Sequence, residues 1–171
     1  MTLGYKSKFT DGTQTYFKEK LLIAAAQGLM IDVNMPYIKM PLTLAVLGIT
    51  SIKPKIHSIR DDEKDRWRGN MLVHHVYGNR TAARDNFLIS RAVSTQRIQI
   101  MDTKKISLDE KGNDTSFGRM RTILIDGKFL RPTEKLEQLA INDGFNSLEH
   151  FFTWFPSNYS GKIIHFTKLR Y

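Results

Sequence analysis

The sequence predicts a single α+β domain with a mixed or barrel-like sheet and helices on one side. Its 171 residues fit one domain and are enough for a hydrophobic core. Strand-like apolar runs fill the middle of the chain, and helical spacing takes over between Leu136 and Phe155. A last strand-like run ends the chain, and this order of elements supports the α+β class.

The first elements are a strand and a helix. Residues 3–9 are predicted to form a strand that enters a turn at Asp11-Gly12. A helix with Gly28 as its stop is predicted from four apolar residues at helical spacing, Phe17, Leu21, Leu22 and Ala25. Pro36 and Pro41 then break any long helix.

The middle of the chain consists of predicted strands separated by polar turns. The strands are expected at residues 55–60, 71–77 and 87–100, the last of them long or bent. Residues 78–86, "GNRTAARDN", form a basic loop. Residues 121–130 are predicted to form a hairpin, because Asp126-Gly127 lies between β-branched flanks.

Two short helices and a strand complete the predicted fold. The helices are indicated by two apolar stripes, Leu136, Leu139 and Ala140, then Leu148, Phe151, Phe152 and Phe155. Gly144 ends the first helix, Asn146 or Ser147 caps the second, and Pro156 closes it. The final strand is expected within residues 161–169.

Composition limits the setting in which the protein works. The chain has no cysteine, so it has no disulfide or thiolate site, and this favours a reducing, cytoplasmic location. The first residues lack the apolar core of a signal peptide, and the longest apolar stretch, residues 41–49, is too short to span a bilayer. A soluble protein without a membrane partner is expected.

Positive charge is concentrated in the middle of the sequence. The chain has 26 Lys and Arg against 17 Asp and Glu, a formal net charge of +9. Residues 66–131 alone contain 13 basic and 6 acidic residues. This distribution favours a polyanionic partner, nucleic acid first, and the alternative is a solvated surface that keeps the protein soluble.

Three segments, in the same order, resemble the ASCH domain of the PUA-like superfamily. They are "KIHSIRDDEKDRWRG", "LAINDGFNSLEHFFTWF" and "GKIIHF". The opening "KFTDGTQTYFKEK" is similar to the start of phage-borne and bacterial members. The resemblance covers most of residues 1–171 as one domain, with an insertion at residues 24–52. It implies a small, bent PUA-like β-barrel with flanking helices, no cofactor, and RNA or nucleosides as ligands.

The resemblance also implies a set of catalytic residues. The family pattern Lys-x-x-Thr-Ile-Arg reads here as Lys55 to Arg60. In a small bacterial ASCH-type enzyme that deacetylates N4-acetylcytidine, that lysine, that threonine and a glutamate are catalytic. They match Lys55, Ser58 and Asp143. Serine keeps the hydroxyl, whereas aspartate keeps the carboxylate with a reach shorter by roughly 1.5 Å.

These three residues supply the groups that amide hydrolysis needs. Ser58 would be the nucleophile, Lys55 the base, and Asp143 the proton shuttle or orienter. Burial and Arg60 lower the pKa of Lys55, while Asp143 raises it. The alternative is structural: Ser58 satisfies a local hydrogen bond, and Asp143 is an ordinary helix-end residue.

Strand geometry provides a test of this set. Side chains alternate along a strand, so Lys55 and Ser58 meet only if the chain turns between them. Pro54 suggests that Lys55 still belongs to a loop. We therefore expect the Lys55 amine within hydrogen-bond reach of the Ser58 hydroxyl, roughly 3 Å.

Five further residues are candidate ligand contacts. Arg60 can grip a phosphate or a base edge with a fork of hydrogen bonds, or pair with a neighbouring carboxylate. Trp67 can stack on a base or belong to the core. Arg80 and Arg84 are candidates for phosphate contacts from the basic loop, and His57 belongs to the same stretch as Arg60.

Other sites are disfavoured by the sequence. Neighbouring His74 and His75 face opposite ways on a strand, and no other ligands at a suitable spacing complete a metal site with them, His57 or His165. Residues 136–152 resemble a helix-turn-helix, but the second helix is aromatic and carries no Lys or Arg. A non-catalytic RNA-binding module, a ribonuclease and a phage-type partner-binding protein remain alternatives to the amidohydrolase.

Overall fold

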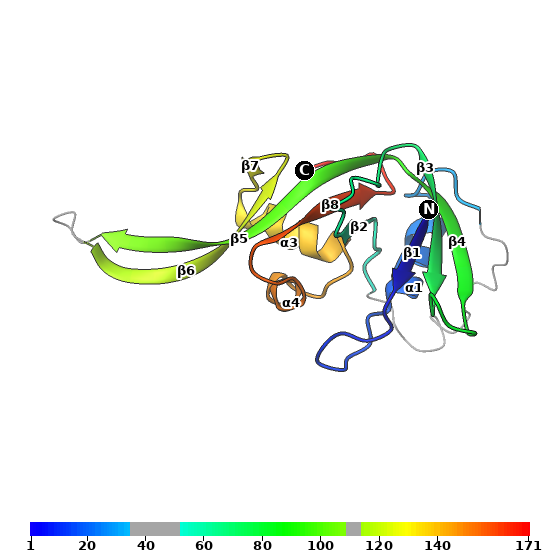
Figure 1. The fold of residues 1–171 in the computed structure, drawn as a ribbon, viewed down its shortest axis with the longest axis horizontal. Coiled ribbons are helices and arrows are strands. Elements are labelled where there is room, and N and C mark those ends of the chain that lie inside the picture. The colour runs from blue at the N-terminus through cyan, green and yellow to red at the C-terminus, as the bar shows by residue number, and fades with distance from the viewer. Residues whose placement is uncertain (35–51, 109–113) are drawn as a thin grey trace.

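The computed structural model describes residues 1–34, 52–108 and 114–171, and its fold is α+β (Figure 1). One sheet has the order β1 (Thr2–Tyr5), β3 (Met71–Tyr77), β4 (Asp85–Ala92). The other has the order β2 (His57–Arg60), β8 (Tyr159–His165), β5 (Ser94–Leu108), β6 (Asp114–Ile125), β7 (Lys128–Phe129). Only the pairing of β1 with β3 is parallel among these strands.

The two sheets share one bent strand. β4 and β5 are separated by Val93 alone, whose N–H donates to the carbonyl of His165 at 2.7 Å. The expected long or bent strand is therefore confirmed, and its bend carries the chain from one sheet into the other. The described strands form two separate ladders and not a closed barrel. The strands β1 and β2 are linked by a side chain, since Arg60 donates to the Gly4 carbonyl at 3.1 Å.

Three helices are described, and their ends follow the predicted signals. They are α1 (Phe17–Ala26), α3 (Thr133–Asn142) and α4 (Leu148–Trp154). Gly28 follows α1 with a left-handed φ of 69°, as a helix stop requires. Ser147 caps α4, because its hydroxyl accepts from the His150 N–H at 3.1 Å.

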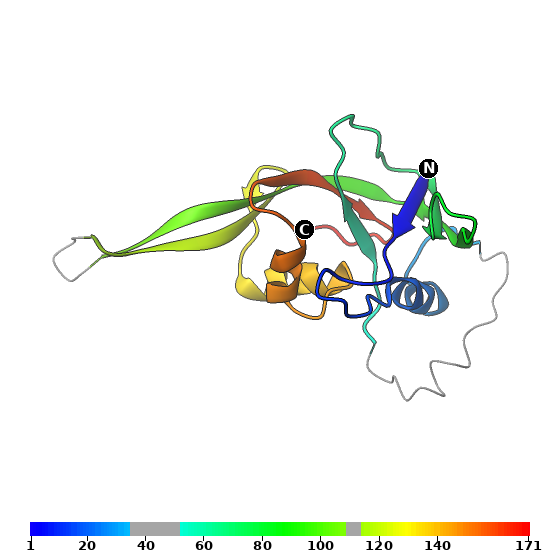
Figure 2. The ribbon, with the colours of Figure 1, turned by 60° about the horizontal axis from the view of Figure 1, so that its bottom comes forward.

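The core is formed by both sheets and the helices, and the helices lie along one side of the five-stranded sheet (Figure 2). Strand β8 contributes Ile163 and Ile164, and the α3–α4 pair contributes Leu139 and Phe151, all of them fully buried. The aromatic second helix is thus core, as predicted, and is not a recognition helix. Burial of these side chains fixes α3 and α4 against the sheet.

The β5–β6 hairpin extends beyond the rest of the fold (Figure 1). Strand β8 pairs with β5 only up to Ile100, and β7 pairs with β6 at Leu124 and Ile125. The remaining length of β5 and β6 runs as a two-stranded ribbon. At the base of β6 the predicted hairpin is confirmed, because Asp126 and Gly127 both have positive φ, at 50° and 79°.

The expected insertion at residues 24–52 is described only in part. Residues 24–26 complete α1, and residues 35–51 lie outside the described part of the chain. None of the described helices has the length and apolar character needed to cross a bilayer.

Candidate functional site

Lys55 and Asp143 meet in a buried ion pair that joins the segment before β2 to the end of α3. Lys55 lies in an extended segment before β2, as Pro54 suggested, and its N–H donates to the Lys20 carbonyl at 3.1 Å. Its Nζ lies 2.5 Å from Oδ1 of Asp143 and also donates to the main-chain carbonyl of Asp143. The side chains are 1% and 3% exposed, so the pair is shielded from water.

Asp143 is positioned by the end of α3 and in turn holds the edge of β2. It is the C-terminal flanking residue of that helix, and its N–H donates to the Leu139 carbonyl. Its Oδ1 also accepts from the main-chain N–H of Ile59 at 3.1 Å. Because β2 is an edge strand, this carboxylate satisfies a donor that no neighbouring strand reaches.

Ser58 precedes Ile59, whose N–H contacts Asp143, but the Ser58 hydroxyl is not hydrogen bonded to the ion pair. This hydroxyl is fully buried, and among the described residues the Tyr5 hydroxyl lies close to it without a well-formed hydrogen bond. The predicted hydrogen bond between Lys55 and Ser58 is therefore wrong. The reason is electrostatic: the ammonium group donates to two oxygen atoms of Asp143, and a carboxylate attracts it more strongly than a hydroxyl.

A second hydrogen-bonded chain runs close to Ser58. The Tyr5 hydroxyl lies near Ser58 and is hydrogen bonded to Nδ1 of His75 at 2.9 Å. Nε2 of His75 is hydrogen bonded to the Ser90 hydroxyl at 2.8 Å. Burial lowers the pKa of His75 to about 3, so this imidazole is neutral near pH 7. Sequence reasoning missed Tyr5, although Leu3 and Tyr5 alternate as residues on the buried face of a strand do.

Burial controls the charges of the ion pair. Burial lowers the pKa of Lys55 to about 8. The attraction of Asp143 opposes this decrease, and the repulsion by Arg60 adds to it. Burial also raises the pKa of Asp143, against the attraction of Lys55. Both pKa shifts favour the neutral forms of the two side chains. Removing the charged groups from water costs more free energy than their mutual attraction provides.

Three residues that were expected to contact a ligand are instead buried or make contacts within the protein. The Arg60 guanidinium donates to the Gly4 carbonyl and lies 5.2 Å from the centre of the Tyr5 ring. Trp67 is buried, so its ring is not exposed for stacking on a base, and its carbonyl accepts from Lys162. His57 is also fully buried. Trp67 and His57 therefore belong to the core and do not form a ligand surface.

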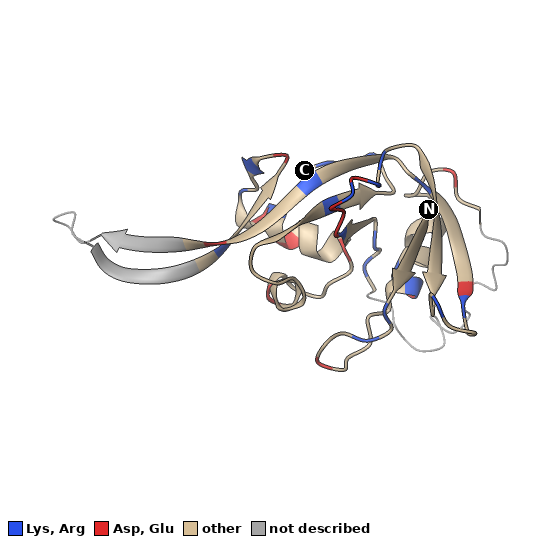
Figure 3. Ribbon diagram, viewed as in Figure 1, with Lys and Arg blue, Asp and Glu red and all other residues tan. Residues whose placement is uncertain are grey.

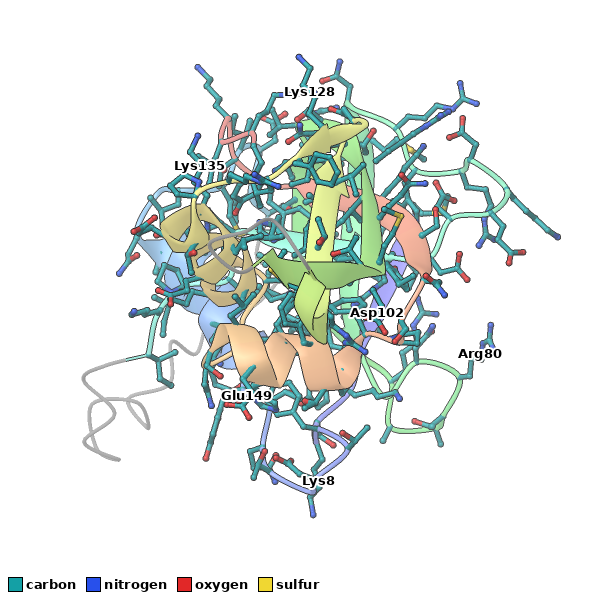
Figure 4. All side chains as sticks on the ribbon, turned by 90° about the vertical axis from the view of Figure 1, so that its left-hand side faces the viewer. Lys8, Arg80, Asp102, Lys128, Lys135 and Glu149 are labelled. Atoms are coloured by element: carbon teal, nitrogen blue, oxygen red, sulfur yellow. The ribbon has the colours of Figure 1, made fainter. Side chains whose placement is uncertain are left out.

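Arg80 and Arg84 lie on the loop between β3 and β4, apart from the ion pair. Both are exposed, and no ion pair involving them occurs in the described ranges. Figure 4 shows the Arg80 side chain pointing outward from this loop. Figure 3 shows Lys and Arg on several elements, interspersed with Asp and Glu. Neither arginine contributes a hydrogen bond or ion pair to the Lys55 site among the described residues.

The histidines do not assemble a metal centre in the part of the chain that is described. No group of three or more His, Asp or Glu suited to a metal ion occurs there. His75 is buried, whereas His74 lies on the other face of β3 beside Asn86. His57 and His165 are neighbours across β2 and β8, with ring centres 5.7 Å apart.

Two cavities occur among the described residues, and neither is lined by Lys55, Ser58 or Asp143. A groove of about 920 Å³ contains four acidic residues of the β2–β3 connection, Asp61, Asp62, Glu63 and Asp65. Their charge does not suit an RNA backbone. The second cavity, about 410 Å³, lies by Tyr16 and Lys20 of the α1 start. The Phe17 ring covers the Lys55 ammonium, 4.7 Å from its centre.

Comparisons with known proteins leave the family open. No protein-family model matches the chain, and no curated protein or solved structure matches it either.

The buried pair generates a stability prediction. Asp143→Leu is expected to lower the free energy of unfolding by about 3–5 kcal/mol, because it leaves the Lys55 ammonium buried without a counter-charge. Adding Lys55→Met should recover about 2 kcal/mol, since no unpaired charge remains and only the Ile59 N–H is unsatisfied. Urea unfolding of both variants measures the difference. A double variant no more stable than Asp143→Leu would contradict this account of the pair.

Proposed function

We propose that this protein is a nucleoside- or RNA-directed ASCH-type module with a PUA-like arrangement, and that it removes the acetyl group from N4-acetylcytidine. The observation that supports this proposal is the ion pair of Lys55 with Asp143, two residues that lie 88 positions apart in sequence. The same carboxylate accepts from the N–H of Ile59, the residue after Ser58, and the Ser58 hydroxyl is buried.

In this proposal the unpartnered Ser58 hydroxyl is the nucleophile. Its oxygen attacks the acetyl carbonyl carbon, and its proton passes by way of Asp143 to neutral Lys55. This relay requires the Ser58 hydroxyl to turn toward Asp143, whose Oδ1 already contacts the Lys55 amine and the N–H of Ile59, the residue after Ser58. The carbon–nitrogen bond then breaks, the cytidine amine takes the proton, and water hydrolyses the acetyl ester to acetate.

Substrate entry in this mechanism requires the start of α1 to move. The Phe17 ring lies over Lys55, and it also lies close to Gly144, next to Asp143. Displacing this ring would connect the pair to the cavity lined by Tyr16 and Lys20. Catalysis is therefore assigned to an opened form of the same site.

The nucleophile is tested with two matched serines. Ser58→Ala is expected to reduce the release of cytidine and acetate from N4-acetylcytidine by at least about 10³-fold, because the nucleophile is lost. Ser94→Ala is the control, since Ser94 also has a buried hydroxyl without a partner but lies on β5. Its activity should match that of the wild type. Absence of turnover by the wild type, or equal turnover by Ser58→Ala, would refute the enzymatic proposal.

The base is tested by the dependence of the rate on pH. Neutral Lys55 accumulates as pH rises through its lowered pKa of about 8. The rate should therefore increase roughly tenfold per pH unit below that value and level off above it. Arg60→Gln should shift the profile to higher pH, because the repulsion by Arg60 helps to lower the pKa of Lys55. A profile that is flat from pH 6 to 9 would exclude Lys55 as the base.

A second candidate function, RNA binding without chemistry, is favoured by two observations. The catalytic candidates line neither of the two cavities, and Arg80 and Arg84 are exposed on a loop with no ion-pair partner among the described residues. Exposed arginines bind phosphates and release counterions. This function uses the loop and leaves the buried pair as a structural element.

Binding measurements at several salt concentrations test this candidate. The double variant Arg80→Gln/Arg84→Gln should weaken the affinity for single-stranded RNA and reduce the slope of log K against log salt by about 1–2, one for each lost phosphate contact. Arg131→Gln is a control at an exposed arginine outside the loop. An unchanged slope in the double variant would remove the loop from any RNA interface.

A further inference from the structure

The cavity of about 410 Å³ beside α1 is lined by residues from four different segments of the chain. It is formed by the N-terminal loop, the first turn of α1, the segment before β2 and the α3–α4 corner. Its lining residues are Gln14, Tyr16, Lys20, Ile52, Lys53, Ile141, Phe145 and Asn146. Among the described residues, this lining has two lysines, two amides and two aromatic rings, and no carboxylate. Its volume is in the range of small-molecule sites.

Lys20 is the central feature of this cavity. It is one of three buried lysines in the described residues, with Lys55 and Lys162, and they are 7%, 1% and 9% exposed. Lys55 is paired with Asp143, and Lys162 lies 2.6 Å from Asp65. Within the described part of the chain, Lys20 alone of the three forms no ion pair with a carboxylate.

The partners of Lys20 are neutral. Its ammonium donates to the Gly144 carbonyl at 2.6 Å and to the Asn146 side-chain oxygen at 3.4 Å. Burial lowers the pKa of Lys20 to about 8, and Glu19 opposes this shift. Burying a cation without a counter-anion costs free energy. An anion that enters the cavity would therefore form a strong, charge-assisted hydrogen bond with this ammonium.

The other residues that line the cavity indicate which kind of anion would bind there. Exposed Lys53 contributes a second positive charge to the lining, which favours a dianion. Tyr16 and Lys20 bring the start of α1 to the cavity, and that helix begins without a side-chain cap. The Tyr16 ring is 42% exposed and offers a flat surface, while Gln14 and Asn146 offer amides for hydrogen bonds.

We propose that this cavity binds a phosphate monoester attached to a flat ring, as in a nucleoside monophosphate. The phosphate pairs with Lys20 and Lys53, and the ring lies on Tyr16. The phosphate site is separate from the Lys55–Asp143 pair and requires no hydrolysis. The two sites are nevertheless neighbours, because the Lys55 N–H donates to the Lys20 carbonyl and Lys20 contacts Gly144.

Calorimetric titration tests the proposal with four probes: cytidine 5′-monophosphate, cytidine, inorganic phosphate and a short RNA ending in a 5′-phosphate. The monophosphate should bind at least about tenfold more tightly than cytidine, through the charge-assisted contact to Lys20. Tighter binding of the RNA identifies a nucleic-acid end as the source of the phosphate. Equal binding identifies the free nucleotide.

Three variants locate the site. Lys20→Met removes the charge but keeps an unbranched side chain only one atom shorter, and it should weaken binding of the monophosphate at least about tenfold, while cytidine binding is unchanged. Lys53→Met, at an exposed position, should weaken it about threefold and more at low salt. Lys135→Met, on exposed α3 surface (Figure 4), should have no effect. Equal affinity for cytidine and the monophosphate, or wild-type affinity in both cavity variants, would overturn the proposal.

The test of the phosphate site gives a result that is independent of the test of N4-acetylcytidine hydrolysis. Ser58→Ala should bind the monophosphate as the wild type does, because its hydroxyl does not line the cavity. Binding without turnover would refute the enzymatic proposal alone, and turnover without Lys20-dependent binding would refute the phosphate site alone.

Discussion

The ion pair between Lys55 and Asp143 is the interaction on which the attachment of β2 to the end of α3 depends. It ties the segment before β2 to the end of α3, and the same carboxylate holds the free edge of β2 through the Ile59 N–H. Arg60 then extends from β2 to the Gly4 carbonyl of β1. A side-chain network therefore joins the two sheets where backbone pairing is absent. Such a network has strict geometric requirements, because every buried charge and donor in it must find its partner.

The turn after α3 connects this network to the cavity. Lys55 and Lys20 donate to the consecutive carbonyls of Asp143 and Gly144. Gly144 has a φ of 93°, and a Cβ there would lie 2.9 Å from the Phe17 ring, so only glycine fits. The two lysines also repel each other, and Lys20 contributes to the lowered pKa of Lys55. An anion beside Lys20 would weaken this repulsion and raise the pKa of Lys55, which couples the phosphate site to the protonation of the pair.

Local patterns predicted the elements, whereas the contacts between distant segments could not be derived from them. Asp126-Gly127 and Ser147 each act within a few residues, so their turn and cap followed from sequence. The convergence of Lys55 with Asp143 came from a resemblance, and the partner of the amine was wrong because a carboxylate displaced the hydroxyl. Lys20 was missed, although its spacing from Phe17, at i and i+3, puts it on the apolar face of α1.

Hydrogen bonds at the junction divide the buried polar groups into two separate sets. The Lys55 amine and the Asp143 carboxylate are paired with each other. Tyr5 and His75 are also paired, in a chain that ends at Ser90. The Ser58 hydroxyl is hydrogen bonded to neither the Lys55 amine nor the Asp143 carboxylate, and the Ser94 hydroxyl of β5 is equally unpartnered, so this feature alone does not distinguish a catalytic serine. The proposed chemistry therefore depends on a rearrangement that brings Ser58 to the Lys55–Asp143 pair, in which burial lowers the pKa of Lys55 to about 8.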